Sequence, residues 1–257
     1  MKTRNIIILI PLLLMILLVS SCYKGWNRIE GNYDVAVETR YLNPFNRVYN
    51  EGSFDVYIIP DTVYYVVIEA ESNLISRIAT IVKGSNLEVT TNDNLQNHYP
   101  MKVYIHTPDI HGVFLSGSGL IDATDISTPF LEIALSGSGY VNFVGEAETL
   151  YVSISGSGDG VIDAVSEEIE AKISGSGELQ MFGSANKGTY FISGSGEIRA
   201  YDLVLQECYA DISGSGDMFI SVEDYLDVTI SGSGSVYYLG DPVIDTHISG
   251  SGNVIHP

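Results

Sequence analysis

The four residues Ser-Gly-Ser-Gly recur eight times in the C-terminal half of the chain at a nearly constant interval. Successive copies are separated by 20, 19, 19, 19, 20, 18 and 18 residues. A flexible Gly/Ser linker keeps neither a period nor apolar flanks, so this spacing indicates one structural unit that is copied and stacked. The copies begin at Ser116, Ser136, Ser155, Ser174, Ser193, Ser213, Ser231 and Ser249.

The residues before each tetrad alternate between apolar and polar side chains. The position immediately before the first Ser is always Leu or Ile, and most residues three and five positions earlier are also apolar. The positions between them are mostly polar, as Glu132, Asp211 and Asp227 show. An apolar period of two is typical of a strand that buries one face.

The same alternation continues through the tetrad, where it places both glycines inward and both serines outward. Beyond the tetrad it reaches further apolar residues, such as Leu179 and Ile198. Glycine inside a strand usually marks a tight bend or a close backbone approach. We therefore expect each tetrad to form a corner whose interior is too narrow for a Cβ atom.

The rung length of 18–20 residues predicts the fold class. An all-β, right-handed parallel β-helix stacks such rungs at about 4.8 Å, so that equivalent residues form ladders. A left-handed helix is the alternative, because 18 residues per turn also suits it. Gains and losses of one residue are expected in a return segment such as residues 145–149.

The segment 31–113 lacks the tetrad but remains rich in β-branched and aromatic runs separated by turn residues. We expect it to form a cap over the first rungs or degenerate rungs of its own. Within it, the spacing of apolar residues over 73–82 predicts a short helix.

The first 22 residues indicate export. Lys2 and Arg4 precede an uncharged apolar run over residues 6–19, which is rather short for a membrane span and ends in small residues. The sequence Val-Ser-Ser-Cys that ends at Cys22 resembles the lipobox of bacterial lipoproteins. In such proteins the peptide is cut before the cysteine, which is then lipidated. An ordinary signal peptide and an uncleaved anchor are the alternatives.

This interpretation divides the chain into four parts. They are a signal peptide at 1–21, a tether at 22–30, the N-terminal β-rich segment at 31–113 and the solenoid at 114–257. Lipid on Cys22 would hold the protein on a membrane, because each buried methylene of an acyl chain contributes about 0.8 kcal/mol. The next residue is Tyr23 rather than Asp, which favours the outer membrane, on either its cell-surface or its periplasmic face.

The chain is strongly acidic, with a formal net charge of −20. From Ser116 onward it contains 21 acidic and 3 basic residues. Such a surface repels nucleic acid and anionic headgroups, so we expect no nucleic-acid partner. With Cys22 assigned to lipid, Cys208 is the one cysteine left, so no internal disulfide is expected. Cys208 falls on an inward position and is expected to be a small buried hydrophobe.

The residue after the tetrad is acidic in four coils, which predicts one ladder of carboxylates. The four residues are Asp159, Glu178, Glu197 and Asp217. Like charges about 5 Å apart repel unless they are solvated or bridged, and oxygen ligands suit calcium. The glycine-rich calcium repeat is not matched, however, so a solvated acidic edge is the leading interpretation and calcium the weaker one. No cofactor is expected.

Two ligand-binding features are weaker still. Tyr151 and Tyr209 share an outward position, and Phe191 lies near it, so these rings could stack on sugars. The outward serines form regular hydroxyl ladders that could match a repetitive ligand. Exposed aromatic residues scattered over a protein with 17 tyrosines are equally easily incidental.

The residues support catalysis poorly. The five histidines show no metal-ligand motif, and the repeats offer Lys172, Lys187 and Arg199 as their cations. Parallel β-helices do host polysaccharide lyases and hydrolases, but here the carboxylates are too numerous to single out a catalytic pair. We therefore expect a protein that is not an enzyme.

A family resemblance joins these features. The lipoprotein-like leader, Asn73-Leu74-Ile75 in a strand-rich segment, and the run from Pro108 into the first tetrad resemble the putative auto-transporter adhesin family with a head GIN domain. The resemblance covers roughly residues 35–257. It implies a Gram-negative envelope location and supplies no catalytic residues.

We expect a lipid-anchored envelope protein whose acidic solenoid binds an extracellular glycan or protein ligand, or acts in adhesion. A structural or assembly component of the envelope is the alternative, and a polysaccharide-active enzyme is less favoured. The chain stops early in a ninth turn at Pro257, so its last rung is a candidate surface for homo-oligomer formation.

Overall fold

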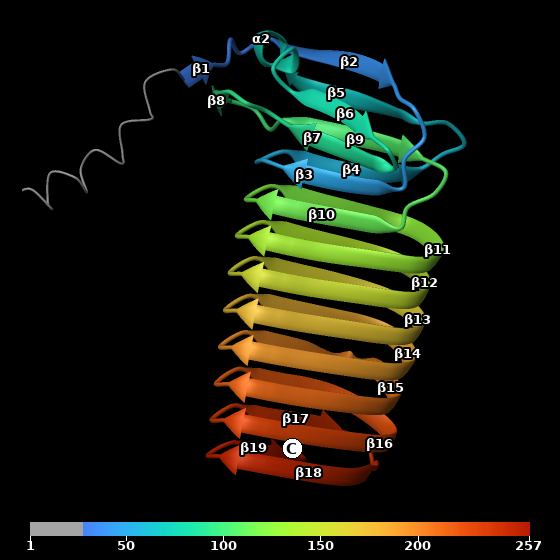
Figure 1. The fold of residues 1–257 in the computed structure, drawn as a ribbon, viewed down its shortest axis with the longest axis vertical. Coiled ribbons are helices and arrows are strands. Elements are labelled where there is room, and N and C mark those ends of the chain that lie inside the picture. Colours follow the sequence, from blue (N-terminus) through green and yellow to red (C-terminus); the bar gives the residue numbers. More distant parts are fainter. Residues whose placement is uncertain (1–27) are drawn as a thin grey trace, which may run out of the picture.

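A computed structural model describes residues 28–257, and Figure 1 shows a tall stack of flattened coils below a cap. In this part of the chain the structure consists of strands and one short helix. The predicted signal peptide and the proposed lipid site Cys22 lie outside the described residues.

Strands β10 to β19 build the stack of coils. From β11 to β16 a single strand makes one full coil, running along one layer, around a bend and back along the other layer (Figure 1). The bounds are β10 (Gly112–Gly117), β11 (Leu120–Gly137), β12 (Tyr140–Gly156), β13 (Asp159–Gly175), β14 (Glu178–Gly194), β15 (Glu197–Gly214), β16 (Asp217–Gly232), β17 (Ser235–Leu239), β18 (Val243–Gly250) and β19 (Asn253–Ile255).

All neighbouring coils pair in parallel, in the register that the tetrads predict. Ser174 pairs with Ser193, which pairs in turn with Ser213, and the apolar residue before each Ser follows the same register. The strands facing the viewer run toward the tetrads while the chain descends, so the coil is right-handed (Figure 1). The predicted right-handed parallel β-solenoid is confirmed.

Each tetrad forms the tight corner, at the left edge in Figure 1. Both serines are exposed, and the second glycine is buried in every tetrad except the last. At Gly194, the first glycine of its tetrad, φ is +134°, and an added Cβ would lie 2.5 Å from the carbonyl oxygen of Gly175 in the previous coil. Ser195 N–H donates to that same carbonyl oxygen at 2.8 Å, so the backbone ladder continues through the corner. The corner therefore requires glycine, as the sequence predicts.

A second bend closes the coil at the opposite edge. Irregularities in pairing lie close to it, between Thr124 and Ile126, between Gln180 and Phe182, and within 200–207. Neighbouring coils therefore differ in their number of residues near this bend, because the backbone is less tightly constrained here than at the tetrad.

The core is a set of apolar ladders between the two layers. Ile173, Ile192 and Ile212 stack directly above one another and are almost completely buried. Burying such a side chain contributes roughly 1.5–3 kcal/mol, so each coil is stabilised mainly by its two neighbours.

The N-terminal segment contains both a cap and degenerate coils. Its elements are β1 (Arg28–Glu30), β2 (Val35–Tyr41), β3 (Arg47–Glu51), β4 (Asp55–Pro60), β5 (Tyr65–Glu71), α2 (Ser72–Ile75), β6 (Ala79–Lys83), β7 (Asn86–Thr90), β8 (Asn94–Gln96) and β9 (Lys102–Thr107). Strands β3 and β4 form a coil without a tetrad, which pairs in parallel with β10 and β11 on one side and with β7 and β9 on the other.

Antiparallel strands end the stack above this coil. Strand β6 pairs with β7, and β5 lies between β9 and β2, all antiparallel. The small parallel pair β1–β8 lies beside them.

The helix predicted over 73–82 is shorter than expected. Helix α2 spans only Ser72–Ile75, and residues 79–83 form β6. The Arg40 guanidinium donates to the carbonyl oxygens of Ile75 and Ile78 at 3.1 and 2.6 Å, which satisfies acceptors where the helix stops. Residues 79–83 therefore form a strand that pairs with β7, although their apolar residues continue the helical spacing.

The other end of the stack has no comparable cap among residues 28–257. There β18 pairs with β16 alone and β19 with β17 alone. In the same residues, no helix is long and apolar enough to cross a membrane.

Candidate ligand-binding face

The outer surface of the strand halves that run toward the tetrads carries three parallel ladders of side chains. We call this surface, on β11 to β15, the aromatic face. The ladder nearest the corner contains Ala134, Ser153, Lys172, Phe191 and Asp211; the middle one contains Glu132, Tyr151, Glu170, Thr189 and Tyr209; and the third contains Phe130, Thr149, Glu168, Lys187 and Glu207.

The three aromatic residues proposed from the sequence all lie on this face. Tyr151 and Tyr209 occupy the same ladder, separated by Glu170 and Thr189. They are therefore three rungs apart, or about 14 Å at 4.8 Å per rung. Phe191 lies on the neighbouring ladder, in the coil next to Tyr209.

Two of the three cations in the repeats also lie on the aromatic face, each above a ring. Lys172 Nζ is 5.1 Å from the centre of the Phe191 ring, and Lys187 Nζ is 5.4 Å from that of Tyr209. Both ammonium groups also contact carboxylates, Lys172 with Glu170 and Lys187 with Glu168. These side chains offer flat apolar surfaces beside donors and acceptors of hydrogen bonds.

Shallow hollows lie on both sides of Tyr151. One, of about 310 Å³, is lined by Phe130, Glu132 and Lys172 among others, and the Phe130 ring is 5.6 Å from that of Tyr151. The other, of about 100 Å³, is lined by Glu168, Glu170 and Lys187 among others. Tyr151 itself is 38% exposed, so one edge of its ring remains open to a ligand.

The four carboxylates after the tetrads form one ladder on the opposite layer. Asp159 pairs with Glu178, Glu178 with Glu197, and Glu197 with Asp217. Arg199 bridges the middle pair, with contacts of 3.0 Å to Glu178 and 2.8 Å to Glu197.

The outer members of this acidic ladder have other partners. Asp159 accepts the Glu178 backbone N–H at 3.2 Å, and Asp217 accepts that of Ser235 at 2.7 Å. Within residues 28–257, no group of three or more His, Cys, Asp or Glu side chains is arranged to hold a metal ion. Arg199 and two backbone N–H groups of the protein thus contact all four carboxylates of the ladder.

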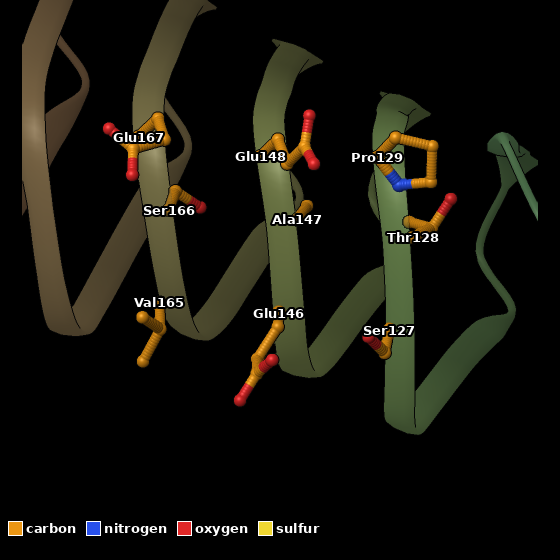
Figure 2. A pocket seen from close by; sticks show the side chains of 9 residues that line it. All are labelled: Ser127, Thr128, Pro129, Glu146, Ala147, Glu148, Val165, Ser166 and Glu167. Atoms are coloured by element: carbon orange, nitrogen blue, oxygen red, sulfur yellow. The ribbon is translucent and has the colours of Figure 1, made fainter.

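A larger hollow than these two lies at the second bend and spans three coils. Figure 2 shows the side chains that line this groove of about 380 Å³, arranged in three short ladders. They are Ser127, Thr128, Pro129, Glu146, Ala147, Glu148, Val165, Ser166 and Glu167. Its three carboxylates are all exposed, and no Lys, Arg or His is among these lining residues. The groove suits a polar or cationic ligand better than acid–base chemistry, which uses carboxylates in contrasting environments.

A second aromatic cluster was not anticipated from the sequence. Phe219 and Tyr237 stack at 4.9 Å on the layer that carries the acidic ladder, and Arg199 lies 5.6 Å from the Phe219 ring. Arg199, Phe219 and Tyr237 occupy the same position after their tetrads. An alignment of the sequences that follow the tetrads would therefore have placed these three side chains on one ladder.

Cys208 lies inside the coil, as predicted. It is fully buried, and this burial raises the pKa of its thiol far above the usual range. Tyr190, in the preceding coil, is also fully buried and its hydroxyl has no hydrogen-bond partner in the described part of the chain.

The fold has close counterparts among known proteins. A family model described as putative auto-transporter adhesin, head GIN domain, matches residues 44–242, which confirms the resemblance drawn from the sequence. No curated protein matches the chain in sequence.

Three crystal structures share this architecture. A putative lipid binding protein from Parabacteroides distasonis has a TM-score of 0.82 and 24% identity, covering 90% of this chain and 100% of that chain. A putative adhesin from Parabacteroides merdae has a TM-score of 0.83 and 22% identity, with the same coverage of 90% and 100%. Another putative adhesin from Parabacteroides distasonis has a TM-score of 0.80 and 21% identity, covering 89% and 99%. At these identities the likeness shows a common fold.

Proposed function

The chain belongs to the putative auto-transporter adhesin family with a head GIN domain, and from this premise we propose that it is an envelope-anchored binding protein whose aromatic face binds glycans. The observation that carries the proposal is the gathering of Tyr151, Phe191 and Tyr209 on one face with Lys172 and Lys187.

The chemistry of the face matches a carbohydrate. Sugar rings present apolar C–H faces, which pack on aromatic rings, and a rim of hydroxyls, which bond to carboxylates and ammonium groups. A rigid solenoid holds these groups at fixed rung spacing, so little ordering is needed on binding. A repetitive polymer could then contact several coils at once, which raises avidity without a deep pocket.

The proposal assigns binding rather than catalysis to the chain. The groove at the second bend combines Glu146, Glu148 and Glu167, all exposed, and its lining contains no basic residue. Lys172 and Lys187 lie on the aromatic face, and Arg199 lies on the opposite layer between Glu178 and Glu197. Family and fold add support for an adhesive role.

Glycan retention on an array tests the aromatic face directly. The full-length protein should be retained by a subset of extracellular glycans, and the Tyr151→Ala/Tyr209→Ala variant should bind them about tenfold more weakly or worse. Tyr140→Ala is the matched control, because Tyr140 is 40% exposed and begins β12 on the other layer. Equal losses in the control and the double variant, or no glycan bound by the wild type, would refute the assignment.

We further propose that Cys22 carries the lipid that anchors the protein to the outer membrane. The apolar leader and the Val-Ser-Ser-Cys sequence support this step. The described chain starts at the capped end of the stack, so an anchor there would leave the acidic coils projecting away from the bilayer (Figure 1). Mass spectrometry of the mature N-terminal peptide should find an acylated Cys22, and Cys22→Ser should release the protein from membranes.

An adhesive role also requires exposure on the cell surface. Protease added to intact cells should cleave the protein while a periplasmic marker stays protected. If the protein is cleaved only after the outer membrane is opened, adhesion is excluded. The alternative role, as a structural component of the envelope, would then take its place.

A further inference from the structure

The last coil exposes residues whose equivalents in β11 to β16 are buried. In β16, Leu226, Val228 and Ile230 are fully buried, whereas their equivalents in β18 are Ile244, Thr246 and Ile248. Ile244 is 37% exposed and Ile248 46% exposed. Among the described residues, β18 also leaves one edge of its backbone without a strand partner.

We propose that this edge pairs with the same edge of a second copy of the chain, giving an end-to-end dimer with a two-fold axis at Thr246. Antiparallel pairing of β18 with β18 would continue both the backbone ladder and the interior across the junction. It would also keep two strongly acidic bodies at opposite ends of the assembly, where their repulsion is smallest.

The sequence of β18 selects this register. In an antiparallel pair, directly opposed side chains lie on the same face of the sheet, so inward residues must oppose inward residues. Centring the pair on Thr246 places Ile244 against Ile248 of the second copy, twice by symmetry. It also places Asp245 against His247 of the second copy, again twice, so each carboxylate meets an imidazole that can donate a hydrogen bond to it.

The adjacent registers are less favourable. Centring the pair on Asp245 would oppose two aspartates, and centring it on His247 would oppose two histidines. The neighbouring strand β16 contributes Asp227 beside Asp245 and the uncharged Thr229 beside His247. Within one chain Asp245 and His247 lie 3.9 Å apart, and their side chains are 59% and 68% exposed, so both remain free to face a second copy.

Disulfide trapping tests the axis. In full-length protein purified in detergent, Thr246→Cys should form a covalent dimer under mild oxidation, because each new cysteine would oppose itself at a separation that a disulfide can span. Val243→Cys is the matched control on the same strand, since 71% exposed Val243 would lie about 20 Å from its counterpart. Cys208 is buried and should not contribute. Monomeric Thr246→Cys, or equal crosslinking of Val243→Cys, would overturn the proposal.

A charge exchange tests the register. Sedimentation should show a dimer that Asp245→His or His247→Asp weakens about tenfold. The double exchange should restore it, because each new histidine would again oppose an aspartate.

Glu170 and Lys172 occupy the same two ladders in β13 and provide the control, since reversing their charges should leave the dimer unchanged. A double exchange at 245 and 247 that fails to restore association would reject this register. The glycan test is independent, because it concerns β12 to β15.

Discussion

The carboxylate of Glu71, which is fully buried in the cap, accepts the backbone N–H of His98 at 2.8 Å. It also accepts the N–H of Tyr33 at 2.8 Å, and the rings of Tyr33 and His98 stack at 3.8 Å. Burial opposes ionisation of Glu71, but the backbone N–H groups of His98 and Tyr33 outweigh it and lower the pKa of Glu71 below 4.5. Glu71 thus links two loops of the cap that are far apart in the sequence.

We predict that acid loosens this cap before it unfolds the coils. Because the pKa of Glu71 is lowered in the fold, its stabilising contribution is complete above the ordinary carboxyl range and disappears as pH falls through the lowered value. The protection of residues 28–34 against hydrogen exchange, measured relative to the intrinsic rate at each pH, should fall at low pH while that of β12 to β15 stays high. Glu71→Gln should show the reduced protection already at neutral pH; wild-type protection in this variant would contradict the prediction.

Alanine at the first glycine of a tetrad should strongly destabilise the stack. Gly194→Ala adds a Cβ that would lie 2.5 Å from a carbonyl oxygen, at a φ of +134°, so we expect a loss of about 2–4 kcal/mol in denaturant unfolding. Gly84→Ala is the control that separates backbone strain from steric crowding, because φ is +63° at Gly84 but an added Cβ would have no atom within 4 Å. This substitution should lower the unfolding free energy by about 1 kcal/mol. Ser193→Ala, at an exposed site, should change it by close to zero. Similar losses at Gly194 and Gly84 would mean that crowding is unimportant.

The thiol of Cys208 should be inert in the folded protein. Burial raises its pKa, so almost no thiolate exists at neutral pH, and reagents cannot reach the sulfur. Alkylation should therefore proceed at the rate of unfolding and become fast in denaturant. Rapid labelling without denaturant would show that the coils around Cys208 open locally.

Removing the hydroxyl of Tyr190 should stabilise the protein. This hydroxyl is buried without a hydrogen-bond partner among the described residues, and such a group costs about 1–3 kcal/mol. Tyr190→Phe should raise the unfolding free energy by about 1 kcal/mol, whereas Tyr209→Phe, at an exposed site, should leave it unchanged. A destabilised Tyr190→Phe would indicate an internal partner for the hydroxyl, such as a buried water.

The sequence predicts the structure of the repeats well because each repeat contains the same short pattern of residues, and this pattern occurs eight times. Eight tetrads fix the register, so the pairing of Ile173 with Ile192, and the shared ladder of Tyr151 and Tyr209, follow from alignment alone. The acidic ladder follows in the same way. Its bridging by Arg199 does not, because that contact depends on side-chain conformation.

The N-terminal coil is not predictable by the same means. Strands β3 and β4 place Glu51-Gly52-Ser53-Phe54 at the corner, which retains the first glycine of the tetrad but puts Phe54 at the second. This coil also lies between β7–β9 and β10–β11, so its order in the stack differs from its order in the chain. Alignment to a period cannot reveal such long-range pairing, which depends on tertiary contacts.

Because the backbone corners are identical, the number of coils could change without any change in the structure of the cap or of the last coil. Each corner bonds to the one before it through the same Ser N–H and Gly carbonyl, as at Ser195 and Gly175, so a duplicated unit would find complementary edges above and below. Every added unit would lengthen the stack by about 4.8 Å without altering either end. Gene duplication within such a chain therefore changes the length of the stack while preserving the structures at its two ends.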